Sequence, residues 1–160
     1  MKFKYLKLVI LLLLVNSTFV FSQDIKVYNF NGFEKYLQKT GDKVYVVNFW
    51  ATWCKPCVKE IPAFNKLYDE YTKQGVELIL VNLDFGKDVQ SRVKQFIKIH
   101  QIKAEVIILD DPDTNAWINK VDINWSGGIP ATVIYNKSKR KFYEQSFEYE
   151  FLEKEVKSFL

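Results

Sequence analysis

The chain has 160 residues, of which 48% are hydrophobic and 16% aromatic, and its formal net charge is +4. These values predict a folded globular domain and exclude a disordered chain, while six glycines and four prolines exclude a fibrous repeat. Two cysteines are too few for a disulfide-stapled scaffold, and with one histidine they cannot complete the usual tetrahedral zinc set. We therefore expect no metal site, and the sequence indicates no cofactor.

Residues 1–22 have the pattern of a secretory signal peptide, with three lysines, an apolar run over 8–15 and a small residue, Ser22, before the expected cleavage point at Gln23. An uncleaved anchor is the alternative, but the uncharged stretch is shorter than the roughly 20 residues that a spanning helix needs. Cleavage would remove those three lysines and lower the net charge from +4 to +1. Nucleic-acid binding then has no electrostatic basis.

Residues 23–160 are expected to form one domain in which strand and helix patterns alternate. Lys43 to Trp50 is β-branched and aromatic with almost no charge, which predicts a central strand covered on both faces. Apolar residues at steps of three and four then predict a helix that ends near Gly75. In chain order, we predict strands at 25–28, 43–50, 76–83, 105–109, 131–135 and 141–145, with helical segments near 33–37, 61–74, 89–97, 114–121 and 152–159.

Cys54 and Cys57 follow the predicted central strand directly and begin the next helix. Cysteines at helix amino termini have pKa values of about 3.5 to 7.5 instead of about 8.5, because unpaired N–H groups and the helix dipole favour the thiolate. Two intervening residues put the second sulfur one turn into the helix. The spacing therefore predicts a redox pair in which Cys54 is the exposed nucleophile and Cys57 resolves the mixed disulfide.

The two residues between the cysteines fit this interpretation. Pro56 is tolerated in a first helical turn, and Lys55 adds a positive charge that favours the thiolate. A purely structural disulfide is the alternative, but so short a loop contributes little stability on the chain-entropy account. Lys55 and Pro56 also differ from the Pro-His pair of strongly oxidising proteins, which favours a reductase.

Three segments of the chain resemble the extracytoplasmic thioredoxin-like reductases of the TlpA/ResA type. They are Val-Val-Asn-Phe-Trp-Ala-Thr-Trp-Cys-Lys-Pro-Cys at 46–57, Lys-Glu-Ile-Pro at 59–62 and Gly-Ile-Pro-Ala-Thr at 128–132. The resemblance implies an α/β thioredoxin-like fold, with a central mixed sheet and helices on both faces. It also implies a cis Ile129-Pro130 bond facing the cysteines, where the backbone of Ile129 pairs with substrate; an ordinary trans proline is the alternative.

The resemblance also implies roles for two polar positions. Thioredoxin carries a buried aspartate where this chain has Asn48, which cannot transfer a proton. Glu60 matches a glutamate of the ResA-like group, so we expect it to be partly buried and to assist deprotonation of Cys57; a solvated helix glutamate is the alternative. Trp53 is expected to cover the thiols and contact substrate, whereas Trp50 is expected in the core.

The sequence thus predicts a monomeric extracytoplasmic thiol-disulfide oxidoreductase that reduces disulfides in envelope proteins. The family resemblance makes apocytochrome c a possible substrate and requires a membrane electron donor to reduce the protein again. Two alternatives stay open. One is a non-catalytic module that holds partner proteins at the Ile129-Pro130 groove, and the other is a peroxidase, for which the chain lacks a peroxidatic cysteine outside the pair.

Overall fold

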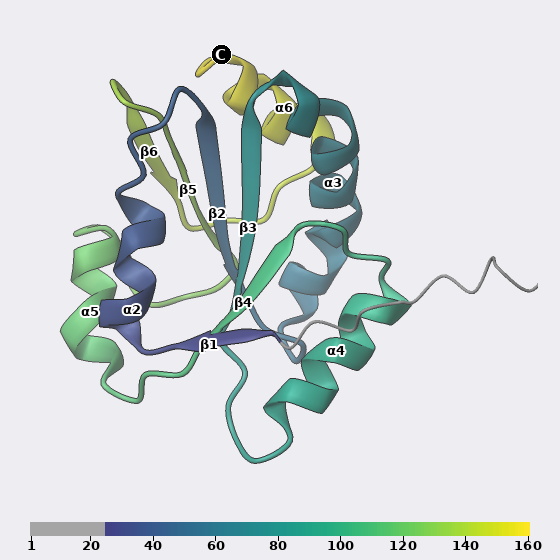
Figure 1. The fold of residues 1–160 in the computed structure, drawn as a ribbon, viewed down its shortest axis with the longest axis vertical. Helices are drawn as coiled ribbons and strands as arrows, with labels where there is room; N and C mark the ends of the chain where they lie inside the picture. Colours follow the sequence, from purple (N-terminus) through teal and green to yellow (C-terminus); the bar gives the residue numbers. More distant parts are fainter. Residues whose placement is uncertain (1–24) are drawn as a thin grey trace, which may run out of the picture.

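The computed structural model describes residues 25–160 and shows a six-stranded mixed sheet with helices on both faces (Figure 1). The predicted signal peptide lies outside the described residues. The strand order is β1-β4-β3-β2-β5-β6. The strands are β1 (Lys26–Tyr28), β2 (Val44–Trp50), β3 (Val76–Asn82), β4 (Glu105–Leu109), β5 (Ala131–Tyr135) and β6 (Arg140–Tyr143). The helices are α2 (Phe30–Phe33), α3 (Lys55–Tyr71), α4 (Val89–Ile99), α5 (Thr114–Val121) and α6 (Tyr149–Lys157), with 3₁₀ turns η2 (Glu34–Leu37) and η3 (Thr72–Gln74).

Strand β2 lies inside the sheet, as its lack of charge predicts. All seven of its residues are buried. It pairs in parallel with β3 and antiparallel with β5. Because β2 and β5 run in opposite directions, the carboxyl end of β2 and the amino end of β5 meet at one end of the sheet, where Phe49 pairs with Ala131.

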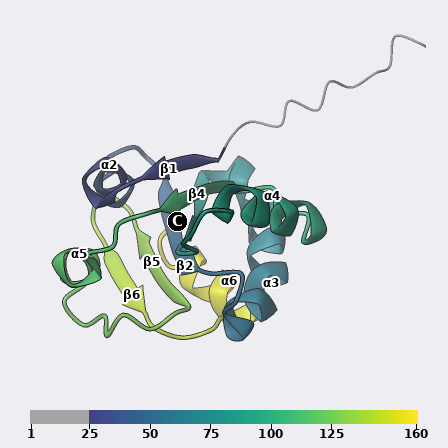
Figure 2. The ribbon, with the colours of Figure 1, turned by 90° about the horizontal axis from the view of Figure 1, so that it is seen from below.

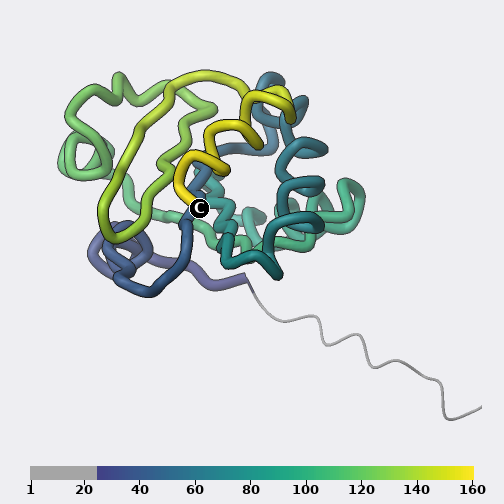
Figure 3. Tube along the Cα trace, turned by 90° about the horizontal axis from the view of Figure 1, so that it is seen from above, coloured from purple at the N-terminus to yellow at the C-terminus, as the bar shows by residue number. Residues whose placement is uncertain are grey.

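The sheet separates two apolar layers, which confirms the predicted helices on both faces. Helices α3, α4 and α6 cover one face, and α2 and α5 cover the other (Figure 2). Viewed from the opposite end, the C-terminal helix α6 runs beside α3 (Figure 3). Phe64 of α3, Val93 of α4 and Leu152 of α6 are fully buried in the first layer, and Phe33 and Trp117 lie in the second.

Among the strands, the largest displacement is at β6, which spans Arg140–Tyr143 and not 141–145; the closing helix α6 is displaced further, since it spans Tyr149–Lys157 and not 152–159. Arg140 joins the strand because its guanidinium donates to the carbonyls of Leu37 and Val121, which lie far away in sequence. The strand stops at Tyr143 because the next carboxylate, that of Glu144, turns to accept the backbone N–H groups of Ser126 and Gly128. Neither set of hydrogen bonds can be predicted from the local sequence pattern.

Within residues 25–160, no helix is long and apolar enough to cross a membrane.

Candidate active site

Cys54 and Cys57 lie where β2 passes into α3, and they form a disulfide. Cys54 is the N-cap of α3, and its Sγ accepts the backbone N–H of Cys57 at 3.3 Å. Pro56 occupies the first turn, where it displaces no helical hydrogen bond. Cys54 is 4% exposed and Cys57 is fully buried, so the prediction that Cys54 is exposed is wrong for the disulfide form, in which the Ile129 carbonyl lies 3.6 Å from its sulfur; Cys54 is only the less buried of the two.

The loop before β5 meets the disulfide from the other side. The Ile129-Pro130 peptide bond is cis, which confirms that prediction. The carbonyl oxygen of Ile129 lies 3.6 Å from Sγ of Cys54. Ile129 is half-buried and Pro130 is buried. The pairing of β2 with β5 therefore brings together two motifs that are 75 residues apart.

Glu60 is almost completely buried, with 2% of its surface exposed. Asn48 Nδ2 donates to Glu60 Oε1 at 2.9 Å and to Thr132 Oγ1 at 3.0 Å, and the backbone N–H of Phe147 donates to Glu60 Oε2 at 2.9 Å. Burial raises the pKa of Glu60 to about 7, although these two hydrogen bonds to the carboxylate oppose the shift. Glu60 follows Cys57 by three residues, so both side chains lie on one face of α3.

The two tryptophans beside the motif have different environments. Trp50 is fully buried in the core, as predicted. Trp53 is 61% exposed, so most of its ring faces solvent. Lys55 is also exposed. Trp125 is 3% exposed, packs on Phe49 with a centroid distance of 4.8 Å, and donates through Nε1 to the carbonyl of Gly128 at 2.7 Å, so it supports the loop before Ile129.

Sequence reasoning missed Asp84, a buried carboxylate that holds the loop before Cys54. Its Oδ1 accepts the backbone N–H of Thr52 at 3.0 Å, and its Oδ2 accepts the Thr52 hydroxyl at 2.7 Å and Nε of Arg92 at 3.4 Å. Asp84 follows β3, whose carboxyl end lies beside that of β2. Polar residues at the carboxyl ends of parallel strands commonly gather at functional sites, and that rule was the available signal.

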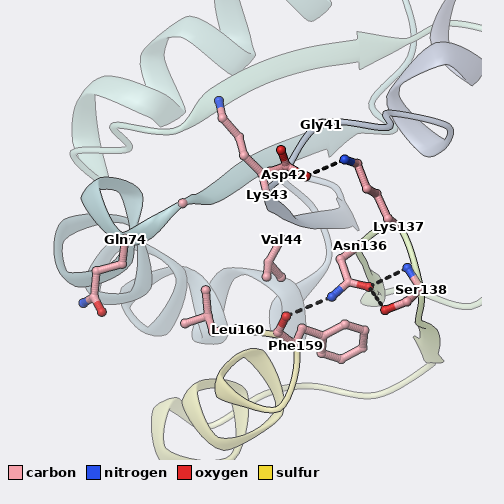
Figure 4. Close-up of a pocket in the computed structure, with 11 residues that line it drawn as sticks. Gly41, Asp42, Lys43, Val44, Gln74, Asn136, Lys137, Ser138, Phe159 and Leu160 are labelled. Atoms are coloured by element: carbon pink, nitrogen blue, oxygen red, sulfur yellow. Dashed lines mark hydrogen bonds and ion pairs between the residues drawn. The ribbon is translucent and has the colours of Figure 1, made fainter.

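A separate hollow of about 320 Å³ lies at the opposite end of β2 (Figure 4). Several of its polar groups already bond to one another, since Lys137 pairs with Asp42 and Asn136 Nδ2 donates to the carbonyl of Phe159 at 2.9 Å. β2 has seven residues, and at about 3.3 Å per residue it places this hollow roughly 20 Å from the disulfide end. It is therefore distinct from the cysteine site.

Comparisons with known proteins agree with the fold. The thiol-disulfide oxidoreductase ResA of Geobacillus thermodenitrificans is 45% identical over 116 residues, which are 72% of this chain and 61% of that protein. A thioredoxin-related protein from Neisseria meningitidis is similar in structure, with 27% identity and a TM-score of 0.64 over 76% of this chain and 88% of that one. StoA from Bacillus subtilis has 25% identity and a TM-score of 0.57 over 72% and 83% of the two chains.

The chain spans between 34% and 61% of the length of curated ResA relatives that it matches. The structural neighbours give it a thioredoxin-like fold. The sequence model of the AhpC/TSA family matches residues 16–140, which is most of the chain. The protein is therefore a member of the AhpC/TSA family with a thioredoxin-like fold and a Cys54/Cys57 pair at its expected position.

Proposed function

We propose that this protein is an extracytoplasmic thiol-disulfide oxidoreductase that reduces disulfides in other proteins. The observation that carries the proposal is the Cys54–Cys57 disulfide at the amino terminus of α3, with the carbonyl of Ile129 3.6 Å from Cys54 Sγ. This arrangement offers a thiol pair, a helix terminus that stabilises a thiolate, and a backbone acceptor for an extended substrate. Similarity to the thiol-disulfide oxidoreductase ResA of other bacteria supports the same activity.

The reaction starts from the reduced protein. The Cys54 thiolate attacks one sulfur of a substrate disulfide, so that an intermolecular disulfide forms and the other substrate sulfur leaves as a thiolate. Cys57 then loses its proton and attacks Cys54 Sγ. The Cys54–Cys57 disulfide forms and the second substrate sulfur leaves. Two electrons pass to the substrate, and an external dithiol donor must return two electrons before the next cycle.

Glu60 is proposed to accept the proton of Cys57 in the second step. A carboxyl group with a pKa of about 7 is near the ideal for a general base at neutral pH. Asn48 orients the carboxyl group but cannot exchange a proton itself. The placement of Glu60 on the Cys57 face of α3 supports this role.

The substrate is proposed to lie across the cis-proline loop. The Ile129 carbonyl would accept a backbone N–H of an extended segment, Pro130 would shape the floor, and the exposed ring of Trp53 would pack against substrate side chains. Lys55 and Pro56 contribute charge and helix geometry at the motif.

We also propose that residues 1–22 direct the chain across a membrane and are cleaved, that the protein acts as a monomer on envelope proteins, and that a membrane-bound dithiol protein reduces it again. We further propose that the protein takes part in cytochrome c maturation.

Equilibration of the protein with thiol buffers of known potential tests whether it acts as a reductase or as an oxidant. A potential near the thioredoxin value of about −270 mV supports a reductase, and one near about −120 mV contradicts it.

Trapping tests the activity itself. In Cys57→Ser, the mixed disulfide formed by Cys54 cannot be resolved, so covalent complexes with substrate proteins should accumulate and should disappear on adding a reducing agent. The matched control, Cys54→Ser, keeps one cysteine but lacks the nucleophile and should form no such complexes. If neither variant forms complexes, the protein is a non-catalytic module that binds partners at the Ile129-Pro130 groove.

A further inference from the structure

A hollow of about 370 Å³ lies at the same end of the sheet as the disulfide, among the loops that follow the carboxyl ends of β3 and β4. It lies between the loops that follow β3 and β4, helix α5 and the loop before β5. Two of its lining residues connect it to the site. Asp84 holds Thr52, two residues before Cys54, and Gly127 lies two residues before Ile129, whose carbonyl is 3.6 Å from Cys54 Sγ. The hollow and the disulfide site therefore share two loops, and a substrate segment that extends from the disulfide along them would reach the hollow.

The inner wall of the hollow is apolar. Leu83, Trp117, Ile118 and Trp125 contribute to its lining. The polar edges of both indoles are already used, because Trp117 Nε1 donates to the carbonyl of Asp111 at 3.4 Å and Trp125 Nε1 donates to that of Gly128 at 2.7 Å. The two side chains therefore offer ring carbon to an occupant, and an aliphatic or planar group fits this wall.

Part of the lining is acidic. Among residues 25–160, three aspartates line the hollow, the buried Asp84 and the more accessible Asp110 and Asp111, and no lysine, arginine or histidine does. Asp84 is occupied by Thr52 and Arg92, and Asp111 accepts the N–H groups of Phe30 and Asp113. Asp110 is exposed, and within residues 25–160 its carboxylate makes no hydrogen bond or ion pair. One negative charge at the rim is thus available to a ligand.

Phe85 stands at the mouth of the hollow with 74% of its surface exposed. The backbone at Phe85 is held, because Arg92 Nη2 donates to its carbonyl at 2.8 Å and Gly86 follows with φ of 100°, a backbone conformation that favours glycine. The Phe85 ring is therefore accessible to a molecule that enters the hollow.

We propose that this hollow binds a lysine or arginine side chain that lies close to the target cysteine of a substrate protein. This inference rests on the proposed function. The long apolar stem of a basic residue would cover the tryptophan wall, since such stems bury readily while the charged head stays near water. The charged head would pair with Asp110, and Phe85 would offer a ring face to the same cation. The site would thereby select disulfides with a basic neighbour.

Matched peptides test the proposal. Each peptide carries one intramolecular disulfide and differs from its partner only by lysine or glutamine, placed in turn at the two positions on either side of one cysteine. The pre-reduced protein is mixed with each peptide at low ionic strength, and the second-order rate of reduction is measured after acid quenching. We expect the lysine peptide to react about threefold faster in at least one position, the scale of a solvent-accessible ion pair, and the preference to shrink as salt is added.

Two variants, each of an exposed aspartate, test whether the preference for the lysine peptide depends on Asp110. Asp110→Asn should abolish the lysine preference, whereas Asp113→Asn, which removes a nearby charge that does not line the hollow, should keep it. An equal rate for both peptides at every position, or the same loss in both variants, would overturn the proposal. Hydroxyethyl disulfide, an uncharged small substrate, distinguishes a failure of the proposed function from a failure of the proposed subsite. If every variant reduces it equally, the site chemistry is intact; if the wild-type protein does not reduce it at all, the proposed function fails and the subsite with it.

Discussion

Glu60 is a carboxyl group held in an environment without compensating charge. Its hydrogen-bond partners are an amide, Asn48, and the backbone N–H of Phe147. Neither carries a positive charge, so the cost of burying a carboxylate is only partly offset. The pKa of about 7 follows from that imbalance. A group in this state can both accept and release a proton near neutral pH.

Replacing Glu60 by glutamine should slow the resolving step. The amide keeps the shape of the side chain but cannot accept the proton of Cys57, and general bases contribute on the order of 10²-fold to such transfers. We expect the release of substrate from the Cys54 mixed disulfide to slow by at least about tenfold at pH 7, and its dependence on a group of pKa about 7 to disappear. Stopped-flow measurement of the rate of the resolving step over a range of pH gives both the decrease in rate and the pKa on which the rate depends. The exposed Glu148→Gln is the control, and a similar loss there would contradict the assignment.

The same carboxyl group should also make stability depend on pH. Its pKa is about 7 in the folded protein against an ordinary value of 4.5, so between these pH values ionisation occurs in the unfolded chain first and favours unfolding. Protonated Glu60 contributes about 3 kcal/mol to the free energy of unfolding relative to the ionised group. This contribution is fully present below about pH 4.5 and is lost as the pH rises towards about 7.

Urea unfolding of the wild type and Glu60→Gln at several pH values isolates this contribution, because the other carboxyl groups are common to both proteins. The variant should gain stability relative to the wild type as the pH rises from 4.5 to 7. A constant difference between the two proteins would mean that Glu60 has an ordinary pKa.

At the scale of elements, the loop between β2 and α3 is held by the end of β3. Asp84 accepts two hydrogen bonds from Thr52 and one from Arg92 of α4, so one carboxylate joins three segments. Asp84→Ala would leave the Thr52 N–H and hydroxyl without their partner, and a lost buried partner costs about 1 to 3 kcal/mol. We expect the free energy of unfolding to fall by about 3 kcal/mol, measured by urea denaturation.

Asp88→Ala is the matched control for this change. Asp88 is exposed at the N-cap of α4, and its side chain makes no capping hydrogen bond. Surface substitutions of this kind usually stay within about 0.5 kcal/mol. An equal effect in both variants would show that Asp84 does not hold the loop.

The elements that the sequence predicts well are those whose signal is local. The uncharged run over 43–50 and the alternation of strand and helix patterns predict β2 and the two-sided architecture. The Cys54-Lys55-Pro56-Cys57 motif likewise predicts the thiol pair. Contacts between distant segments carry no such signal. The bond from Phe147 to Glu60 spans 87 residues, and those from Arg140 reach carbonyls up to 103 residues away. The burial of Glu60 could be predicted only from the family resemblance.

At the scale of the whole molecule, the residues of the candidate active site lie together at one end of the sheet. The carboxyl ends of β2 and β3 and the amino end of β5 supply Cys54, Asp84 and Pro130. The loop before α6 adds Phe147. The opposite end carries the hollow of Figure 4, whose Lys137 and Asn136 already have partners within the chain. The two ends of one scaffold therefore differ in what they offer to a second molecule.

A protein that cycles between dithiol and disulfide must keep this scaffold in both states. The Cys54–Cys57 disulfide closes a loop with a sequence separation of only 3, so on the chain-entropy account it stabilises the fold by about 2 kcal/mol at most. A thiolate at the amino terminus of α3 would recover part of that in the reduced state. Reduction should therefore lower the free energy of unfolding by less than about 2 kcal/mol. Cooperative unfolding should be retained.

Urea unfolding followed by far-ultraviolet circular dichroism, with and without excess dithiothreitol, measures this difference directly. The Cys54→Ser/Cys57→Ser double variant controls for any effect of the reductant, since its curve should be the same in both conditions. Loss of cooperative unfolding on reduction would mean that the disulfide is a structural staple. A scaffold that depends on its disulfide cannot complete a thiol-disulfide cycle, whereas one whose two apolar layers are sufficient for folding leaves both cysteines available for electron transfer.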